Sequence, residues 1–244
     1  MFQEKIIDIL KNKYKQEVLG MCIYGSRAGN VYSENSDMDV LVLVKENSLK
    51  VQSVFLKDEG IFIECFIFDI NDFLQIKNQI EIDSSSWDGI VVHWLQEPIK
   101  ILKDTDKILE NIIMEVKSKT LIVTEEYKNK LIQNVSREIE CLTRYHKNDK
   151  EEYQQAFILK FNYLVTQLLV LYLALRNEPW WGEKNALIYL KNQNSSIYEN
   201  YLKMLKTTNN QEKMINLEQF LVELCTDGYS LLGYATEPVV SFKG

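Results

Sequence analysis

The sequence predicts an α+β fold, in which a domain with a small mixed β-sheet precedes an all-helical domain. Most of the short apolar runs typical of strands lie before Asp72, whereas the apolar spacing beyond Thr124 is almost entirely helical. A chain of 244 residues with 46% hydrophobic content is also long enough for two small domains, each with its own core. We therefore expect one domain over residues 1–120 and a second over residues 121–244.

The elements of the first domain follow from these runs, because Val, Ile and Phe favour the pleated surface of a sheet. Gly25 and its small neighbours suit a tight turn after the first strand. Asp104 can cap the last helix by accepting hydrogen bonds from free backbone amides. In order, we expect a helix around 2–10, strands over 18–24, 39–45 and 61–68 with a β-prone stretch at 49–56, helices over 72–80 and 88–96, a strand at 99–102 and a helix from 104 to about 117.

The second domain is expected to contain helices alone, because its apolar residues recur at helical spacing. A polar break at 147–150 and a loop at 177–182 that contains Pro179 separate the helices. We expect helices over 125–145, 151–175, 184–191, 198–205 and 217–232.

Composition limits the classes of partner. The formal net charge of −7 argues against a nucleic-acid-binding protein, since phosphate backbones are bound by clustered Lys and Arg, and it favours a small or cationic ligand. The four cysteines lack the paired spacing of a zinc site or redox motif, which indicates reduced core residues. No signal peptide and no charge-free membrane span is evident, so we expect a cytoplasmic protein without membrane contact. A homodimer is left open.

The chemistry is concentrated in Ile23-Tyr24-Gly25-Ser26-Arg27-Ala28 and in Ser36-Asp37-Met38-Asp39-Val40. Carboxylates at positions i and i+2 of a strand point to the same face, so Asp37 and Asp39 can share hard cations such as Mg²⁺. Two such ions, roughly 3.5–4 Å apart, can activate a nucleophile and hold the leaving phosphates of a transferred group.

Two further features complete this predicted site. Gly25 lets the backbone approach a phosphate closely, the Ser26 hydroxyl adds a donor, and the amides at the start of a following helix can bind the phosphate. Glu64 shares a strand face with Phe62, Phe66 and Phe68, where a charge needs a partner such as a metal ion.

These residues resemble the signature of the DNA polymerase beta-like nucleotidyltransferase superfamily, which is Gly25-Ser26, ten residues, then Asp37-x-Asp39. The resemblance implies that Asp37 and Asp39 bind two Mg²⁺ ions and that Ser26 lies at the triphosphate of an NTP. It also implies that Glu64 is the third carboxylate and accepts the proton of the attacking hydroxyl, as in several antibiotic-modifying relatives.

The resemblance extends to the second domain, since relatives often carry helical C-terminal domains with a lysine that reaches the phosphates. Lys184, after Trp180 and Trp181, matches that lysine. One departure is that the second glycine of the motif falls one place early, at Gly29, which leaves Asn30 at the expected position; Asn tolerates the left-handed backbone that such a turn needs.

Other interpretations of these residues stay open. Glu64 could face solvent at a sheet edge, with Asp69 or Asp72 as the third carboxylate instead. Arg27 could contact phosphate or lie on the surface, and the aromatic residues before Lys184 could serve interdomain packing.

The expected reaction is transfer of a nucleoside monophosphate, AMP from ATP, to the hydroxyl of a small molecule. By resemblance, the leading acceptors are aminoglycoside and lincosamide antibiotics. The alternatives are transfer to a protein or RNA, as in toxin-neutralising nucleotidyltransferases, and an inactive nucleotide-sensing relative.

Overall fold

The computed structural model describes residues 2–29, 34, 36–47, 50–225 and 231, and it has the α+β class that the sequence predicts. The chain forms two compact units, Met1–Leu121 and Ile122–Gly244. The first contains a small mixed sheet with helices and the second contains helices, and each is described by itself.

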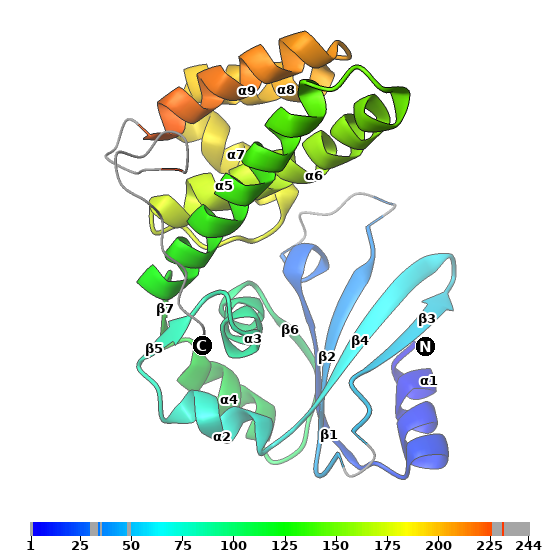
Figure 1. The fold of residues 1–244 in the computed structure, drawn as a ribbon. Coiled ribbons are helices and arrows are strands. Elements are labelled where there is room, and N and C mark those ends of the chain that lie inside the picture. Colours follow the sequence, from blue (N-terminus) through cyan, green and yellow to red (C-terminus); the bar gives the residue numbers. More distant parts are fainter. Residues whose placement is uncertain (1, 30–33, 35, 48–49, 226–230, 232–244) are drawn as a thin grey trace. The chain divides into compact units, whose positions relative to one another are not determined.

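A five-stranded sheet organises the first unit (Figure 1). The strand order is β3-β4-β2-β1-β6. Strands β2 and β4 pair in parallel, whereas the β1–β2, β1–β6 and β3–β4 pairs are antiparallel. The bounds are β1 Val18–Tyr24, β2 Met38–Val44, β3 Ser53–Asp58, β4 Ile61–Asp69 and β6 Lys100–Asp104.

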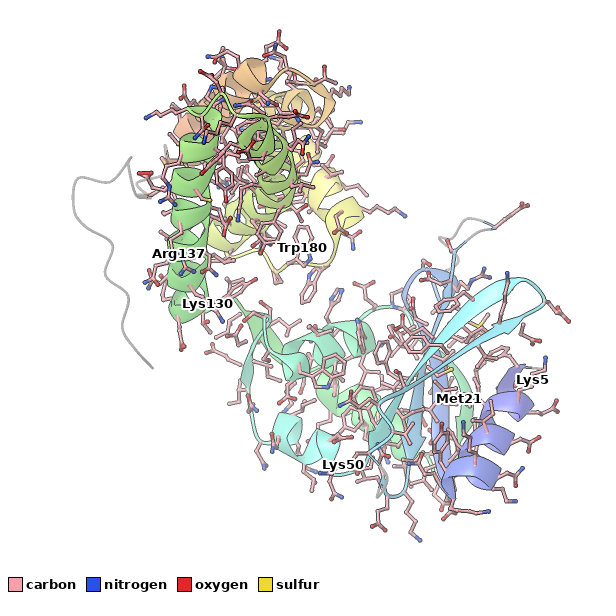
Figure 2. The ribbon with its side chains drawn as sticks, turned by 45° about the vertical axis from the view of Figure 1, so that its right-hand side comes forward. Lys5, Met21, Lys50, Lys130, Arg137 and Trp180 are labelled. Atoms are coloured by element: carbon pink, nitrogen blue, oxygen red, sulfur yellow. The ribbon has the colours of Figure 1, made fainter. Side chains whose placement is uncertain are left out.

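Helices cover both faces of this sheet, which explains why its central strands are almost continuously apolar. On one face, α1 (Phe2–Asp8) and the π turn η1 (Ile9–Lys13) pack on a cluster that includes Met21, while Lys5 lies on the outer side of the helix (Figure 2). On the other face lie α2 (Asp72–Lys77), α3 (Trp87–Gln96) and α4 (Ile108–Val116).

Most of the helices and strands of the first unit lie close to their expected bounds. The carboxylate of Asp104 accepts hydrogen bonds of 2.9 Å from the amides of Leu109 and Glu110, so its predicted contact with the first turn is confirmed, but the helix begins at Ile108 rather than at Asp104. A two-stranded sheet of β5 (Glu81–Asp83) and β7 (Thr120–Ile122) was not predicted. Each of these strands has three residues, too few to show the alternation that marks a strand.

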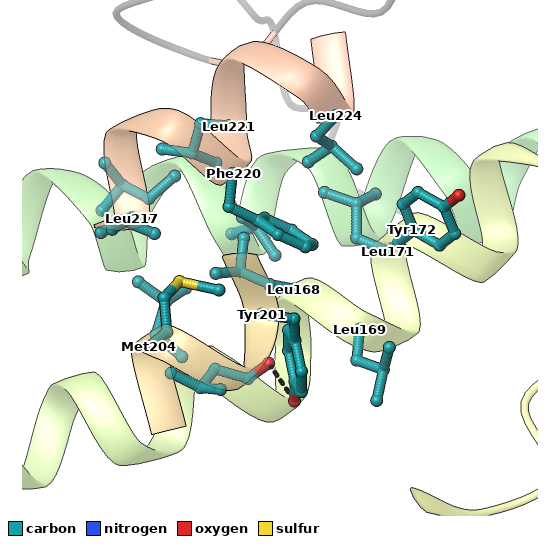
Figure 3. Close-up of a cluster of buried hydrophobic side chains, with 14 of the residues drawn as sticks. Leu168, Leu169, Leu171, Tyr172, Tyr201, Met204, Leu217, Phe220, Leu221 and Leu224 are labelled. Carbon is teal, nitrogen blue, oxygen red and sulfur yellow. Dashed lines mark hydrogen bonds between the residues drawn. The ribbon is translucent and has the colours of Figure 1, made fainter. Parts of the chain in front are cut away.

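The second unit is a bundle whose core is formed by apolar side chains from all of its helices (Figure 3). Burial of each Leu or Phe side chain contributes about 1.5–3 kcal/mol, so this core is the main source of stability. The buried Tyr201 hydroxyl donates to the Val165 carbonyl at 3.1 Å, which satisfies the one polar group of that ring. The helices are α5 Glu125–His146, α6 Glu151–Leu175, α7 Glu183–Gln193, α8 Ser195–Lys206 and α9 Asn210–Cys225.

The predicted bounds of the last helix were wrong. Helix α9 begins at Asn210 rather than Leu217, and the Asn209 side chain accepts a 3.0 Å hydrogen bond from the Glu212 amide near its start. The first turns carry few apolar residues, so the periodic signal starts late. The predicted end, over residues 226–230 and 232, lies outside the described residues.

Helix α6 has the length and mean hydropathy of a membrane span, although it is not free of charges, since it contains Lys160. More than half of its most apolar window, 56%, is buried within the protein, as for the core helix of a bundle. Length and composition alone are weak evidence for a span.

Helix α3 is fixed closely against β5 by Gly89. The Ser86 hydroxyl caps the helix by accepting from the Gly89 amide at 3.0 Å. A Cβ atom at position 89 would lie 2.1 Å from the carbonyl oxygen of Asp83 and 2.7 Å from the Cα of Ser84. Backbone atoms cannot yield as a flexible side chain does, so this position requires glycine.

We predict that Gly89→Ala lowers the free energy of unfolding by about 1–3 kcal/mol, because the helix must shift away from β5. Urea denaturation followed by circular dichroism measures this change. Gly29→Ala is the matched control, since a Cβ at position 29 would meet Pro98 at an ordinary 3.4 Å. Equal stabilities of the two variants would show that α3 is not seated as described.

Candidate active site

Asp39 and Glu64 are direct neighbours in the sheet. The parallel pairing of β2 with β4 sets Asp39 opposite Glu64, and the antiparallel pairing with β1 sets Asp39 opposite Tyr24. Side chains alternate along a strand, so Asp39 shares a face with the buried Leu41, and Glu64 shares the same face with Phe66. The two carboxylates therefore point from adjacent strands to the face covered by α2, α3 and α4.

Asp37 completes a cluster of like charges. It is exposed and lies one residue before β2 begins. Burial and, to a smaller extent, the nearby charges of Asp37 and Glu64 together raise the pKa of Asp39 to about 6. The pKa of Glu64 is raised by its burial and by Asp37. The structure thus brings together the three carboxylates that the sequence analysis selected.

An aromatic wall borders these carboxylates and was not predicted. The Trp94 ring stacks on Tyr24 at 5.0 Å between centroids and packs against Phe66 at 4.8 Å. Burial, followed by the charges of Asp39 and Glu64, raises the pKa of the Tyr24 phenol, so this group stays protonated. Tyr24 directly precedes the Gly-Ser turn in the sequence. Its position opposite Asp39 depends on the register between β1 and β2, which cannot be predicted from the sequence because a loop separates the two strands.

Gly25 lies against the carboxylate cluster. Its φ of +70° is in the left-handed region, and a Cβ there would lie 3.2 Å from Oδ2 of Asp39. Both facts require glycine, since a larger side chain would be strained and would press on the acid. The turn therefore brings bare backbone beside Asp39.

The helix expected after this turn is absent from the described residues. Instead, η2 (Gly25–Arg27) is a single 3₁₀ turn closed by hydrogen bonds of 3.2 Å from the amides of Ala28 and Gly29 to the Gly25 carbonyl. Ser26 lies in this turn. Asn30, the departure from the motif, lies outside the described residues.

Arg27 binds its own loop. Its Nε donates to the carbonyl oxygens of Ser36 at 3.0 Å and Asp37 at 2.8 Å, and Nη2 donates to Ser36 as well. The sequence analysis placed Arg27 at the nucleotide or on the surface and missed this contact, because nothing in the local pattern marks a side chain that binds ten residues ahead.

Lys184 belongs to the second unit, where it is exposed in the first turn of α7. Trp180 packs on the apolar core of that unit, which supports a packing role for this aromatic residue. The predicted contact of Lys184 with phosphates joins the two units and stays a prediction.

Asp69 and Asp72 do not belong to the carboxylate cluster. Asp69 pairs with Val44 at the other end of β2, five residues along β4 from Glu64, a separation of roughly 16 Å. Asp69 and Asp72 instead line a cavity of about 640 Å³ together with Phe68 and Trp87. Position therefore favours Glu64 over Asp69 and Asp72 as the candidate third carboxylate.

The donor set fits Mg²⁺ in its chemistry. Among the described residues, no group of three or more acidic, His or Cys side chains is arranged so that it could hold a metal ion. Mg²⁺ does not require such a group, because it keeps several waters and is usually held by one or two carboxylates together with substrate phosphates. Burial, followed by the charges of Asp37 and Glu64, raises the pKa of Asp39, and a bound cation would oppose this shift.

The sign of this pKa shift gives a stability prediction in the absence of divalent cations. The pKa of Asp39 is higher in the folded chain than its usual 3.8. The stability that protonated Asp39 contributes is therefore complete below about pH 3.8 and is lost as the pH rises through about 6. Asp39→Asn should therefore stabilise the protein relative to wild type at about pH 7.5, and less so at about pH 4.5.

Calorimetry in EDTA at both pH values measures this difference. Asp106→Asn, which removes one exposed carboxylate from a turn, is the matched control and should show no such trend. A difference between Asp39→Asn and wild type that does not vary with pH would contradict the raised pKa.

Comparison with known proteins identifies the family of this chain. A solved structure of a nucleotidyltransferase-like protein from Exiguobacterium sibiricum 255-15 is similar at 12% identity, with a TM-score of 0.41, over 91% of this chain and 75% of that chain. A search among curated proteins found no match. The family model of the nucleotidyltransferase domain matches residues 3–168, more than half of the sequence. The chain therefore belongs to the nucleotidyltransferase domain family, whose reaction is nucleoside monophosphate transfer in general.

Proposed function

We propose that this protein transfers AMP from ATP to a hydroxyl of a small cationic acceptor, with two Mg²⁺ ions held by Asp37, Asp39 and Glu64. The observation that carries the proposal is the pairing of Asp39 with Glu64 across β2 and β4, beside Asp37 and the Gly25 turn. Such a cluster is unfavourable by itself and becomes favourable when cations and a triphosphate are bound.

The residues present can support each part of the transfer. The acceptor oxygen attacks the α-phosphorus, the bond between that phosphorus and the bridging oxygen breaks, and pyrophosphate leaves with the electron pair. Bound Mg²⁺ would neutralise charge on the phosphate oxygens and favour ionisation of the hydroxyl. Glu64, beside Asp39 on the adjacent strand, takes the hydroxyl proton as the general base. Gly25 leaves room for the triphosphate beside Asp39.

The nature of the acceptor is inferred from charge and family resemblance. The net charge of −7 favours a cation over a nucleic acid. The aminoglycoside type is the first acceptor to test because its amines are cationic, and the lincosamide type is the second. Transfer to a protein or RNA partner remains an outcome of the same assay, in which labelled AMP would appear on a macromolecule.

The first prediction concerns metal and nucleotide binding. Mg²⁺ with a nonhydrolysable ATP analogue should raise the melting temperature of the wild type, because ligands that bind only the folded state stabilise it. Asp37→Asn and Asp39→Asn should each remove most of this increase, since each takes one ligand from the ions. Differential scanning calorimetry with and without Mg²⁺ measures the effect.

The control is Asp106→Asn, which should respond to Mg²⁺ and nucleotide as the wild type does. If both active-site variants kept the full increase, the metal assignment would be wrong. The activity itself is tested by following pyrophosphate release from each NTP with a panel of hydroxyl acceptors. If no acceptor supported pyrophosphate release, the proposed reaction would be wrong, although the family assignment would stand.

The second prediction separates the base from the other metal ligands. Glu64→Gln should still bind nucleotide, because Asp37 and Asp39 remain, whereas turnover should fall by about 10²–10⁴, the usual effect of removing a positioned base. The pH profile of the residual activity should lose the dependence on an ionised base. Near wild-type turnover in Glu64→Gln would exclude Glu64 as the proton acceptor.

A further inference from the structure

The two aspartates are supported in different ways. Asp39 lies within β2 and has a ladder partner on either side, Tyr24 on β1 and Glu64 on β4. The β1–β2 ladder ends at Asp39 and the β2–β4 ladder ends at Met38, so Asp37 lies beyond both. Its backbone therefore needs another support if its carboxylate is to stay beside that of Asp39.

We propose that Arg27 is the positioning residue for Asp37, holding the strand entry so that the first carboxylate is aligned before any ligand binds. The Nε–H of Arg27 is shared between the carbonyl oxygens of Ser36 and Asp37, at 3.0 and 2.8 Å, and Nη2 bonds the Ser36 carbonyl. A planar guanidinium presents its donors in a fixed fork, so contact with two successive carbonyls fixes the direction of the chain as well as its distance.

The anchor of this fork is itself rigid. Arg27 ends the η2 turn, which follows β1 directly and is closed by hydrogen bonds to the Gly25 carbonyl. Because Gly25 also lies against Asp39, one turn touches the second aspartate and reaches the first through Arg27. The positions of both aspartates therefore depend on the same short turn, Gly25–Arg27.

This assignment differs from a phosphate-binding role for Arg27. A phosphate ligand would contribute only when nucleotide is present, whereas a positioning residue acts on the empty site. Partners that orient metal ligands typically change metal affinity or activity by about 10–100-fold when they are removed. The inference rests on the proposed function for its metal, but the order of Asp37 can be measured without metal or substrate.

The test uses the full chain with Arg27→Ala and Arg27→Lys, and Arg137→Ala as a matched control on the surface of α5, where Arg137 donates to Asn134 (Figure 2). Mn²⁺ binding without nucleotide is measured by electron paramagnetic resonance. Backbone ¹⁵N relaxation without metal gives the order parameter of the Asp37 amide. Melting temperatures establish that each variant is folded.

In Arg27→Ala, we expect Mn²⁺ affinity to fall by about 10–100-fold and the Asp37 order parameter to fall from about 0.85 towards about 0.6. Arg27→Lys keeps the charge but not the fork, so it should recover only part of both values. Arg137→Ala should match the wild type.

The proposal is overturned if Arg27→Ala keeps the wild-type order at Asp37, or if Arg27→Lys restores order and Mn²⁺ affinity in full. Unchanged metal binding with a raised KM for NTP would assign Arg27 to phosphate instead. Should the wild type bind no Mn²⁺, the proposed function fails, while the order of Asp37 in Arg27→Ala still decides the role of Arg27.

Discussion

The parallel pairing of β2 with β4 is the constraint on which the active site depends, because it fixes two carboxylates side by side at one end of the sheet. A shift of one residue in this register would move Glu64 to the face covered by α1, away from Asp39. Apolar clusters on both faces prevent such a shift, since it would also exchange the side chains of β4 between them. The core of the first unit therefore stabilises an arrangement that the charges alone would oppose.

The sequence predicted those parts of the protein in which the local pattern is sufficient. The apolar runs of β1 and β4 and the spacing of Asp37 and Asp39 are local signals, and they located the sheet and the acids. Trp94 could not be placed at the site, because its contact with Tyr24 depends on how α3 docks on the sheet. Short strands such as β5, and a polar helix start such as Asn210, leave too weak a pattern for prediction.

Arg27 illustrates a different limit of sequence interpretation. A cation beside a phosphate-binding motif suggests a ligand for phosphate, yet its donors bind the main chain before Asp37. Asp39 is held by backbone ladders and Asp37 by the hydrogen bonds of a side chain, so the two aspartates are supported by different interactions.

The aromatic wall connects the stability of the site with its chemistry. Tyr24, Trp94 and Phe66 reduce the water around the acids, and burial is the largest cause of the raised pKa of both Asp39 and Glu64. The same surroundings make the metal-free cluster costly and, in the proposed reaction, strengthen its attraction for cations. A more polar wall would stabilise the empty protein and weaken all of these effects, so the unfavourable electrostatics of the empty site follow from the environment that its chemistry requires.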